Sequence, residues 1–352
     1  MAEEKPANLP KASRELIKAQ NGSYEVIKPL ATGLFGAIYK VKREGDGKLF
    51  AMKCESLRIK KSILRQASSV LQALTIPSNH FVTIEERGNV PGRFLFVVYP
   101  LLGKNLKELI EEVTDKKYTI TSALRIAEQT LASIRDLHRN GFIHRDIKPS
   151  HFCIGLESEQ QHHAIFFLDF GLCKRPKFKT EVKVDLSDEE KQLRKGAIHY
   201  RGVVRYASIM SHCGKDLGFR DDMESWFYIL IELITGQLPW ALLAKNNEYD
   251  VAVLKSSLRK EDNLNKVLRD KKLSSSLFDI LAYINMPKAL NEYVDYDKIY
   301  ITLIEIYDKI GANKNSPPDW DCLADYNGPP YQTNLVKGKC WNDLTAPMPK
   351  ES

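Results

Sequence analysis

The fold is decided by His144-Arg-Asp-Ile-Lys-Pro149 and by Asp169-Phe-Gly171, which follows later in the chain. Between them lies the apolar segment 164–168, whose residues predict a short strand that ends just before Asp169. Either run alone is unremarkable. Both occur here in one order, behind a glycine-containing turn and a lysine on a predicted strand, so we interpret these features as parts of one site.

The charged residues of these runs suit phosphoryl transfer. Asp146 would accept or orient the proton of the attacked hydroxyl group, and Asp169 would bind a magnesium ion that bridges the phosphates of ATP. Lys148 stands two positions after Asp146, where its positive charge would lie beside the transferred phosphoryl group. The pattern therefore predicts ATP and Mg²⁺ as cofactors and Asp146, Lys148 and Lys53 as catalytic residues.

Upstream, Leu30-Ala-Thr-Gly-Leu-Phe-Gly-Ala-Ile38 is a turn between predicted strands, and its small residues would let backbone amides approach phosphates. A pair of glycines between strands is by itself typical of a plain hairpin. Phe50-Ala-Met-Lys53 favours the phosphate interpretation, because a lysine on this strand reaches the α- and β-phosphates; the alternative is a solvated lysine. The predicted nucleotide contacts here are Leu30, Gly33, Gly36, Ile38, Ala51 and Lys53.

The predicted elements change character near Gly103. Before it, β-branched and aromatic residues predict strands, and apolar residues at helical spacing predict one helix over 63–74. After it, the spacing predicts mainly helices, among them 106–113, 122–140 and 221–235. We therefore expect one region rich in strands and a second that is helical.

Motifs in the second half of the chain carry a family resemblance. Most protein kinases have Ala-Pro-Glu after the catalytic motifs, whereas this chain has motifs that resemble the casein kinase 1 superfamily, namely Arg205-Tyr-Ala-Ser-Ile209, Arg220-Asp-Asp-Met-Glu-Ser225 and Gln237-Leu-Pro-Trp240. Two more are similar to its tau-tubulin kinase branch, namely Tyr200-Arg-Gly-Val-Val-Arg-Tyr-Ala-Ser208 and Pro318-Asp-Trp-Asp321. The resemblance covers residues 24–321, and Lys148 matches the lysine that marks serine/threonine kinases.

The resemblance implies a bilobal protein-kinase fold of the α+β class. The N-lobe would be small, antiparallel and β-rich with one main helix, and the C-lobe would be larger and mainly α-helical. The implied segments are a flexible leader at 1–22, the N-lobe and hinge at 23–102, the C-lobe at 103–322 and a loosely held tail at 323–352. Within the leader, residues 13–20 have the pattern of a helical turn or two.

The resemblance also implies where the adenine would bind. It would lie between Ala51 and Cys153, with the carbonyl of Pro100 and the backbone of Leu102 as its hydrogen-bonding groups. Pro100 has no amide hydrogen, but only its carbonyl is needed there. Tyr99 would occupy the gatekeeper position and narrow the back of the pocket.

Two further roles follow from the resemblance. Asp222 would hold the backbone of the catalytic loop, the alternative being an ordinary helix N-cap. Gly202 and Arg205 would form an anion pocket for acidic or prephosphorylated protein substrates, the alternative for Arg205 being a surface salt bridge. Ala244 stands where the family usually offers a lysine, and this counts against the pocket.

Some positions depart from the family pattern. His151 stands where the family has the asparagine that binds a second magnesium ion, and imidazole suits manganese better than magnesium, so Mn²⁺ is an alternative metal. Ala67 stands where the helix should offer a glutamate to Lys53, and Gln66 is a candidate substitute. Ala31 replaces the first loop glycine, which restricts the backbone only mildly.

These substitutions leave three hypotheses. The first is a serine/threonine protein kinase with reduced activity. The second is a nucleotide-binding pseudokinase that acts as a scaffold or competitor. The third is a non-catalytic binder of acidic or phosphorylated proteins through Arg205 and the segment 172–201, which carries nine basic and five acidic residues.

Composition limits the other partners. A net charge of +7 spread over 352 residues fits a solvated surface, so no nucleic-acid partner is expected. The most apolar run, 226–234, is interrupted by Glu232 and is too short to cross a bilayer, so no membrane partner is expected. Six scattered cysteines favour reduced thiols in the cytoplasm, no secretory signal is expected, and the nucleus is the alternative location. We expect a monomer.

Overall fold

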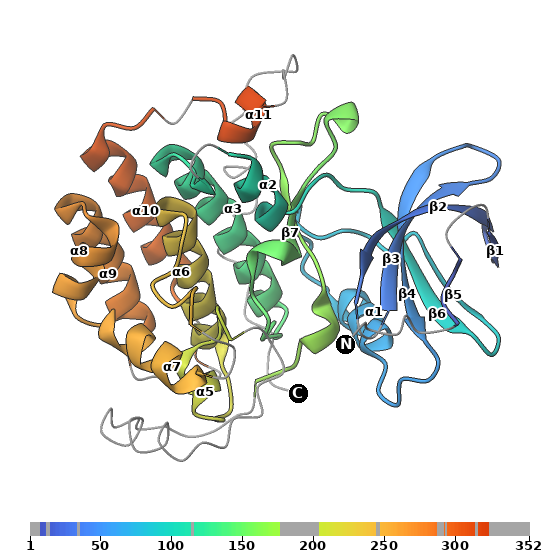
Figure 1. The fold of residues 1–352 in the computed structure, drawn as a ribbon, viewed down its shortest axis with the longest axis horizontal. Helices are drawn as coiled ribbons and strands as arrows, with labels where there is room; N and C mark the ends of the chain where they lie inside the picture. The colour runs from blue at the N-terminus through green and yellow to red at the C-terminus, as the bar shows by residue number, and fades with distance from the viewer. Residues whose placement is uncertain are drawn as a thin grey trace. The chain divides into compact units, whose positions relative to one another are not determined.

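The computed structural model describes residues 8–11, 15–33, 36–113, 116–176, 204–243, 247–286, 292, 294–313 and 316–323. The chain forms two compact units, which are coloured mainly blue to cyan and mainly green to red in Figure 1. The first comprises Met1–Thr75, Phe81–Gly103 and Leu168–Cys173. The second comprises Ile76–His80, Lys104–Phe167 and Lys174–Ser352.

A six-stranded antiparallel sheet of order β1-β2-β3-β4-β6-β5 builds the first unit. Its core is formed by alternate residues that point to one face, and Tyr24, Val26, Val41, Met52 and Phe94 are completely buried there. The strands are β1 Leu16–Ala19, β2 Gly22–Thr32, β3 Gly36–Arg43, β4 Leu49–Ser56, β5 Glu86–Val90 and β6 Phe94–Pro100.

The prediction for the start of the chain was wrong. Residues 16–19, expected within a loose leader that has a helical turn, form strand β1 and pair with β2 in the register Ile17↔Tyr24. Ile17 is only 2% exposed, and Leu9 joins the same core. The burial of these two side chains outweighs the weak local preference for a helix.

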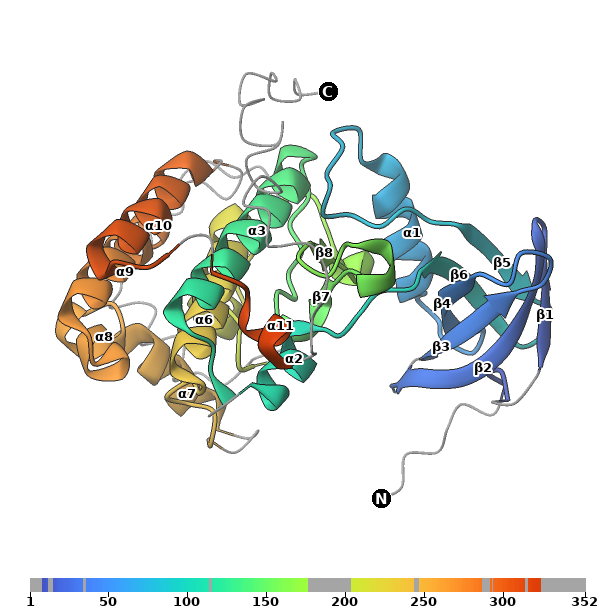
Figure 2. The same ribbon diagram turned by 90° about the horizontal axis from the view of Figure 1, so that it is seen from above.

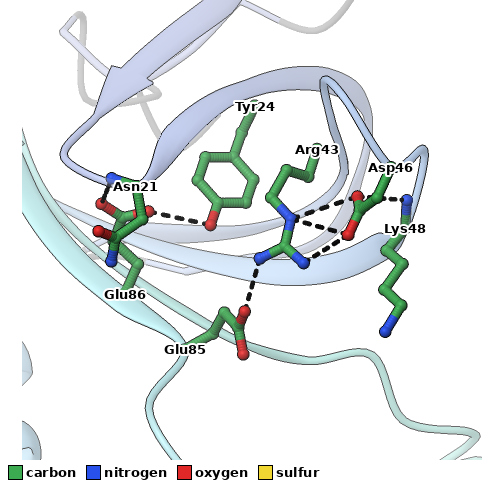
Figure 3. Close-up of polar contacts among 7 residues, drawn as sticks. All are labelled: Asn21, Tyr24, Arg43, Asp46, Lys48, Glu85 and Glu86. Atoms are coloured by element: carbon green, nitrogen blue, oxygen red, sulfur yellow. Dashed lines mark hydrogen bonds and ion pairs between the residues drawn. The ribbon is translucent and has the colours of Figure 1, made fainter.

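The two ends of the sheet are tied together by one buried carboxylate (Figure 3). Glu86 on β5 accepts hydrogen bonds from the backbone amide of Asn21 at 2.8 Å and from the Tyr24 hydroxyl at 3.0 Å, and both donors lie at the β1–β2 end of the sheet. Nearby, the Arg43 guanidinium pairs with Asp46 and Glu85. Strands β1 and β5, at the two ends of the sheet order, therefore lie close together and are joined there through side chains.

Helix α1, Ile63–Ala73, begins against the strand that carries Lys53. Ser62 caps it by accepting from the Arg65 amide, and Glu55 on β4 accepts from the amides of Ile63 and Leu64 at 2.8 and 3.0 Å. A carboxylate at this helix N-terminus accepts from N–H groups that have no partner within the helix, and its negative charge interacts favourably with the helix dipole. Glu55 thus joins β4 to α1.

The second unit is mainly helical, as predicted. Helices α3 and α6 lie side by side in its core, and the Trp226 indole on α6 donates to the Thr130 hydroxyl on α3 at 3.0 Å (Figure 2). Its helices are α2 Leu106–Glu112, α3 Ile120–Arg139, α5 Ile209–His212, α6 Phe219–Thr235, α7 Glu248–Ser257, α8 Glu261–Leu268, α9 Lys271–Ile284, α10 Tyr296–Ile310 and α11 Asp319–Leu323. A hairpin of β7, Phe152–Ile154, and β8, Ile165–Phe167, completes it.

The two units confirm the α+β, bilobal protein-kinase fold, with a β-sheet N-lobe and a helical C-lobe. The boundary is more interleaved than the sequence predicted, because Ile76–His80 belongs to the helical unit and Leu168–Cys173 to the sheet unit. None of the described helices combines the length and the apolar character needed to span a membrane.

Candidate active site

Lys53 and Asp169 meet within the first unit. Lys53 lies in the middle of the sheet, between Ile38 on β3 and Val97 on β6. Its Nζ atom is 2.8 Å from Oδ1 of Asp169. The sequence placed both residues at the phosphates of ATP, and the structure brings them together as an ion pair.

Close packing explains the Asp-Phe-Gly run. Asp169 has φ +64° in the left-handed region, which aspartate tolerates better than most residues, and a 3-10 turn at Phe170–Leu172 follows it. A Cβ atom on Gly171 would lie 2.1 Å from Cγ2 of Ile63 at the start of α1, so only glycine fits. Phe170 is buried and meets Phe81 edge to face, with ring centroids 5.4 Å apart. This packing fixes the position of Asp169.

Helix α1 contributes no carboxylate to Lys53. Ala67, at the position where the family pattern has glutamate, is buried at 3% exposure. Gln66, the candidate substitute, donates its side-chain amide to the carbonyl oxygen of Cys173 at 3.2 Å. That suggestion for Gln66 was therefore wrong, and the partner of Lys53 comes from the segment after β8.

In the second unit, a buried carboxylate holds the catalytic loop. Asp222 on α6 accepts hydrogen bonds from the backbone amides of His144 and Arg145 at 2.5 and 2.8 Å, and lies 2.9 Å from Nε2 of His138. Burial alone would raise the pKa of Asp222, but the hydrogen bond from His138 and the neighbouring imidazoles hold it below its ordinary value. Asp222 therefore stays ionised and fixes the loop.

The N-cap alternative for Asp222 belongs to its neighbour. Asp221, the third residue of α6, accepts from the Gly218 amide at 2.7 Å and from the Ser208 hydroxyl at 2.6 Å, and so caps a helix end where Gly218 has no side chain to do so. Burial raises the pKa of Asp221 to about 7. Two adjacent acids thus have different tasks, one structural at the helix end and one at the catalytic loop.

Asp146 and Lys148 face one another on this loop. The Lys148 ammonium donates to Oδ2 of Asp146 at 2.7 Å, and the Asp146 amide donates to Nδ1 of His144 at 3.3 Å. The His144 ring stacks on Phe167 of β8 with centroids 4.5 Å apart. The carboxylate is therefore held with a positive charge beside it, as a base next to a transferred phosphoryl group requires.

His151 lies against the same aspartate. It ends a 3-10 turn at Pro149–His151, and its Nδ1 is 2.9 Å from the carbonyl oxygen of Asp146. Because a carbonyl only accepts, Nδ1 must carry the hydrogen. The other ring nitrogen, Nε2, faces the Asp146 carboxylate and lies 3.8 Å from its Oδ2 atom.

The donor atoms fit a metal ion unequally. The Asp169 carboxylate is a hard oxygen ligand of the kind that Mg²⁺ prefers. The imidazole of His151 is not, and it suits Mn²⁺ or other softer divalent ions better. Asp169 fits a magnesium ligand, whereas His151 fits a ligand for a second magnesium ion poorly.

Most predicted nucleotide contacts lie in the first unit. Ala51 pairs with Tyr99 across β4 and β6, and Gly33 donates its amide to the carbonyl of Gly36 at 2.9 Å. A Cβ on Gly36 would lie 2.1 Å from the carbonyl oxygen of Cys54, so this turn requires glycine. The same unit holds Leu30, Ile38, Lys53, Pro100 and Leu102.

Cys153, the predicted partner of Ala51 around the adenine, lies on β7 of the second unit. Its thiol is half-buried, and desolvation raises its pKa to about 12. Tyr99, the predicted gatekeeper, lies on β6 opposite Ala51. Burial and, to a smaller extent, the Asp169 charge raise the pKa of its hydroxyl.

The predicted anion pocket is only partly described. Gly202 and Ala244 lie outside the described residues. The Arg205 guanidinium pairs with Glu232 at 3.2 Å and donates to the Ala241 carbonyl at 3.4 Å, although its side chain is still 40% exposed. The structure therefore shows the salt bridge that the sequence offered as the alternative.

The sequence did not point to Lys255, which supports the segment around Arg205. Its ammonium is buried and donates to the carbonyls of Val204 and Ala207 at 2.7 and 2.6 Å, and burial lowers its pKa to about 7. Trp240 holds the same segment by donating to the Arg205 carbonyl at 2.7 Å. The available signal was a lysine one turn after the buried Val251.

Comparisons with known proteins agree with this geometry. The family model for the protein kinase domain matches residues 24–288. A probable serine/threonine-protein kinase of Dictyostelium discoideum is 31% identical over 318 residues, covering 89% of this chain and 59% of the relative. Casein kinase I homolog 1 of Saccharomyces cerevisiae is 27% identical over 332 residues, covering 89% of this chain and 56% of the relative.

The serine/threonine-protein kinase spe-6 of Caenorhabditis elegans is 29% identical over 248 residues, covering 69% of this chain and 62% of the relative. The chain thus spans about three-fifths of the length of these curated relatives. The match to the family model includes both units, the Lys53–Asp169 pair and the loop that carries Asp146. The chain therefore belongs to the protein kinase domain family, alongside serine/threonine kinases.

Proposed function

We propose that this chain is a catalytically competent serine/threonine protein kinase that transfers the γ-phosphate of ATP to acidic or prephosphorylated proteins. One observation carries the proposal. Asp146 lies 2.7 Å from the Lys148 ammonium on a loop whose backbone is locked by Asp222. A scaffold that only bound nucleotide would have no need of a general base held in this way.

The residues divide the work of transfer between them. Asp146 would accept the proton of the substrate hydroxyl, and Lys148 would stabilise the charge on the transferred group. Lys53 would bind the α- and β-phosphates, and Asp169 would hold the metal. The bound divalent ion would neutralise charge on the phosphates.

His151 gives the proposal its metal preference. A second magnesium ion would lack the usual oxygen ligand at this position. With Mg²⁺, transfer by the wild type should therefore be slower than transfer by His151→Asn. Mn²⁺ accepts imidazole more readily and should partly restore the rate. Reduced activity with Mg²⁺ is thus part of the proposal.

The substrate class rests on positive charge. The segment 172–201 carries nine basic against five acidic residues, and the Arg205 side chain is partly exposed despite its pairing with Glu232. Such charge would attract acidic or phosphorylated proteins. The tau-tubulin kinase-like assignment, a cytoplasmic location and a monomeric state belong to the same proposal and rest on sequence pattern.

Transfer from labelled ATP to an acidic protein, with Mg²⁺ and then with Mn²⁺, tests the proposal. The full chain should show transfer, and Asp146→Asn should lower it at least about a hundredfold, the typical effect of a general base. No transfer with either metal, or equal transfer by Asp146→Asn, would overturn the proposal. In that case a thermal shift with ATP would identify a nucleotide-binding scaffold, because a ligand that binds only the folded state stabilises it.

A further inference from the structure

Two adjacent histidines and one aspartate converge in the second unit, separate from the residues assigned to catalysis. His162 and His163 lie just before β8, and Asp321 lies on α11. Nε2 of His163 is 2.7 Å from Oδ2 of Asp321, and Nε2 of His162 is 3.7 Å from Oδ1. Each oxygen of one carboxylate therefore faces an imidazole nitrogen.

The three side chains are buried, and the surrounding structure fixes their backbones. Relative exposure is 5% for His162, 5% for His163 and 6% for Asp321. The Gln129 amide donates to the His163 carbonyl at 2.9 Å, and the Trp320 indole donates to the His162 carbonyl at 3.2 Å. The donor atoms are thus held in place before any ligand arrives.

A second carboxylate of α11 docks the helix. Asp319 accepts hydrogen bonds from the Thr119 amide at 2.6 Å and from the Ser122 hydroxyl at 2.8 Å, at the start of α3. Helix α11 is therefore attached to α3 independently of the histidines. The contacts of Asp319 account for docking without any need for two imidazoles at Asp321.

We propose that His162, His163 and Asp321 form a zinc site. Zinc binds imidazole nitrogen and carboxylate oxygen at about 2.0–2.2 Å, so ligand atoms in a tetrahedral site lie roughly 3.3 Å apart. One ligand atom from each of the three residues lies within 4.8 Å of the other two, so small side-chain rotations would bring them to that separation.

The donor set favours zinc over magnesium and calcium. Magnesium and calcium prefer sites made of oxygen ligands, whereas zinc binds sets of two imidazoles and one carboxylate. Three protein ligands leave the fourth tetrahedral position for a water molecule. Zinc bound by these three residues would cross-link α11 to the loop that precedes β8, and so stabilise the C-terminal part of the second unit.

The competing explanation is a metal-free hydrogen bond between His163 and Asp321. That bond uses only Oδ2 of the carboxylate. Among the described residues nothing donates a hydrogen bond to Oδ1, which is fully buried. Leaving a buried carboxylate oxygen without a hydrogen bond is unfavourable, and a cation bound by the carboxylate and both imidazoles would remove that cost.

Zinc binding by the full chain tests the proposal. The purified protein, first stripped with a chelator, should bind one equivalent of zinc in competition with a chromophoric chelator, and its Tm should rise. Asp321→Asn and His163→Ala should each weaken binding at least about a hundredfold, more than is typical for residues that only orient ligands. Asp319→Asn, on the same helix, should bind zinc like the wild type while its Tm without metal falls.

Cobalt gives a readout that does not depend on stability. Co²⁺ added to the stripped wild type and to Asp319→Asn should produce the visible absorption of a tetrahedral site, and Asp321→Asn should not. Failure of the wild type to take up zinc would overturn the proposal even if a variant misfolds. Zinc binding that Asp321→Asn leaves unchanged would also overturn it, because other histidines would then be the ligands.

Discussion

Replacing Asp222 by asparagine should separate the charge of this residue from its shape. The Asp222 carboxylate accepts from the amides of His144 and Arg145 at 2.5 and 2.8 Å and lies 2.9 Å from Nε2 of His138. Asparagine keeps only one acceptor oxygen, so its NH₂ group must face at least one of these N–H groups. A backbone amide cannot reverse its hydrogen bond to suit.

The magnitude follows from these contacts. A hydrogen bond to a charged group contributes about 1.5–3 kcal/mol, and a buried donor left without a partner costs about 1–3 kcal/mol. Asp222→Asn loses at least one such bond and leaves at least one such donor, so we expect a loss of about 3–5 kcal/mol in the free energy of unfolding. That is a large part of the stability of a typical domain.

The neighbouring Asp221 provides a matched control. It is also buried, but its partners are the Gly218 amide and the Ser208 hydroxyl. In Asp221→Asn the side-chain oxygen can still accept from Gly218, and the new NH₂ group can donate to Ser208, because a hydroxyl also accepts. This variant should therefore unfold with nearly the wild-type free energy.

Urea denaturation of wild type, Asp222→Asn and Asp221→Asn at about pH 5 measures the difference, because Asp221 still holds its proton there while Asp222 is ionised. Phosphate transfer should also fall in Asp222→Asn, because the loop that carries Asp146 loses its anchor. Equal losses of unfolding free energy in the two variants, or a loss below about 1 kcal/mol in Asp222→Asn, would refute this account of the carboxylate.

Three further predictions follow from single side chains. Burial raises the pKa of Asp221 from 3.8 to about 7, so the folded state holds a proton that the unfolded state releases; stability should fall as the pH rises between these values, and a urea series on Asp221→Asn should show a flatter profile. In His151→Asn, the transfer rate with Mg²⁺ divided by the rate with Mn²⁺ should rise about tenfold, which corresponds to about 1.4 kcal/mol in activation free energy. An unchanged ratio would show that His151 is not a metal ligand. Gly171→Ala should cost about 1–3 kcal/mol through overpacking and lower the Tm, because its Cβ would lie 2.1 Å from Ile63. Gly33→Ala, whose Cβ would have its nearest neighbour at 3.9 Å, should keep the wild-type Tm, and equal shifts would contradict the packing argument.

The sequence predicted those features that depend on local order. Helices α3 and α6 have long apolar periodicity, so their positions were predicted to within a few residues. Strand β1 was missed because four residues carry too little periodicity, and Ile17 is explained only by its pairing with Tyr24. A short strand is specified by its partner and not by its own sequence.

The site shows the same division. The absence of a carboxylate near Ala67 was visible in the sequence, but the partner of Lys53 was not, because Asp169 lies far along the chain. The separate tasks of Asp221 and Asp222 depend on which donors the fold brings to each of them. Lys255 and the pair His163–Asp321 likewise owe their contacts to tertiary packing.

The ion pair between Lys53 and Asp169 has a consequence for how nucleotide would enter. Before ATP binds, the ammonium and the carboxylate serve as each other's counterion at 2.8 Å. Phosphate oxygens would replace the carboxylate at Lys53, while a divalent cation would replace the ammonium at Asp169. Each charge would then have a counterion both before and after such a double exchange. The ion pair thus occupies the positions that ATP and its metal ion would take together. ATP alone would leave Asp169 without a counterion, and the metal ion alone would leave Lys53 without one.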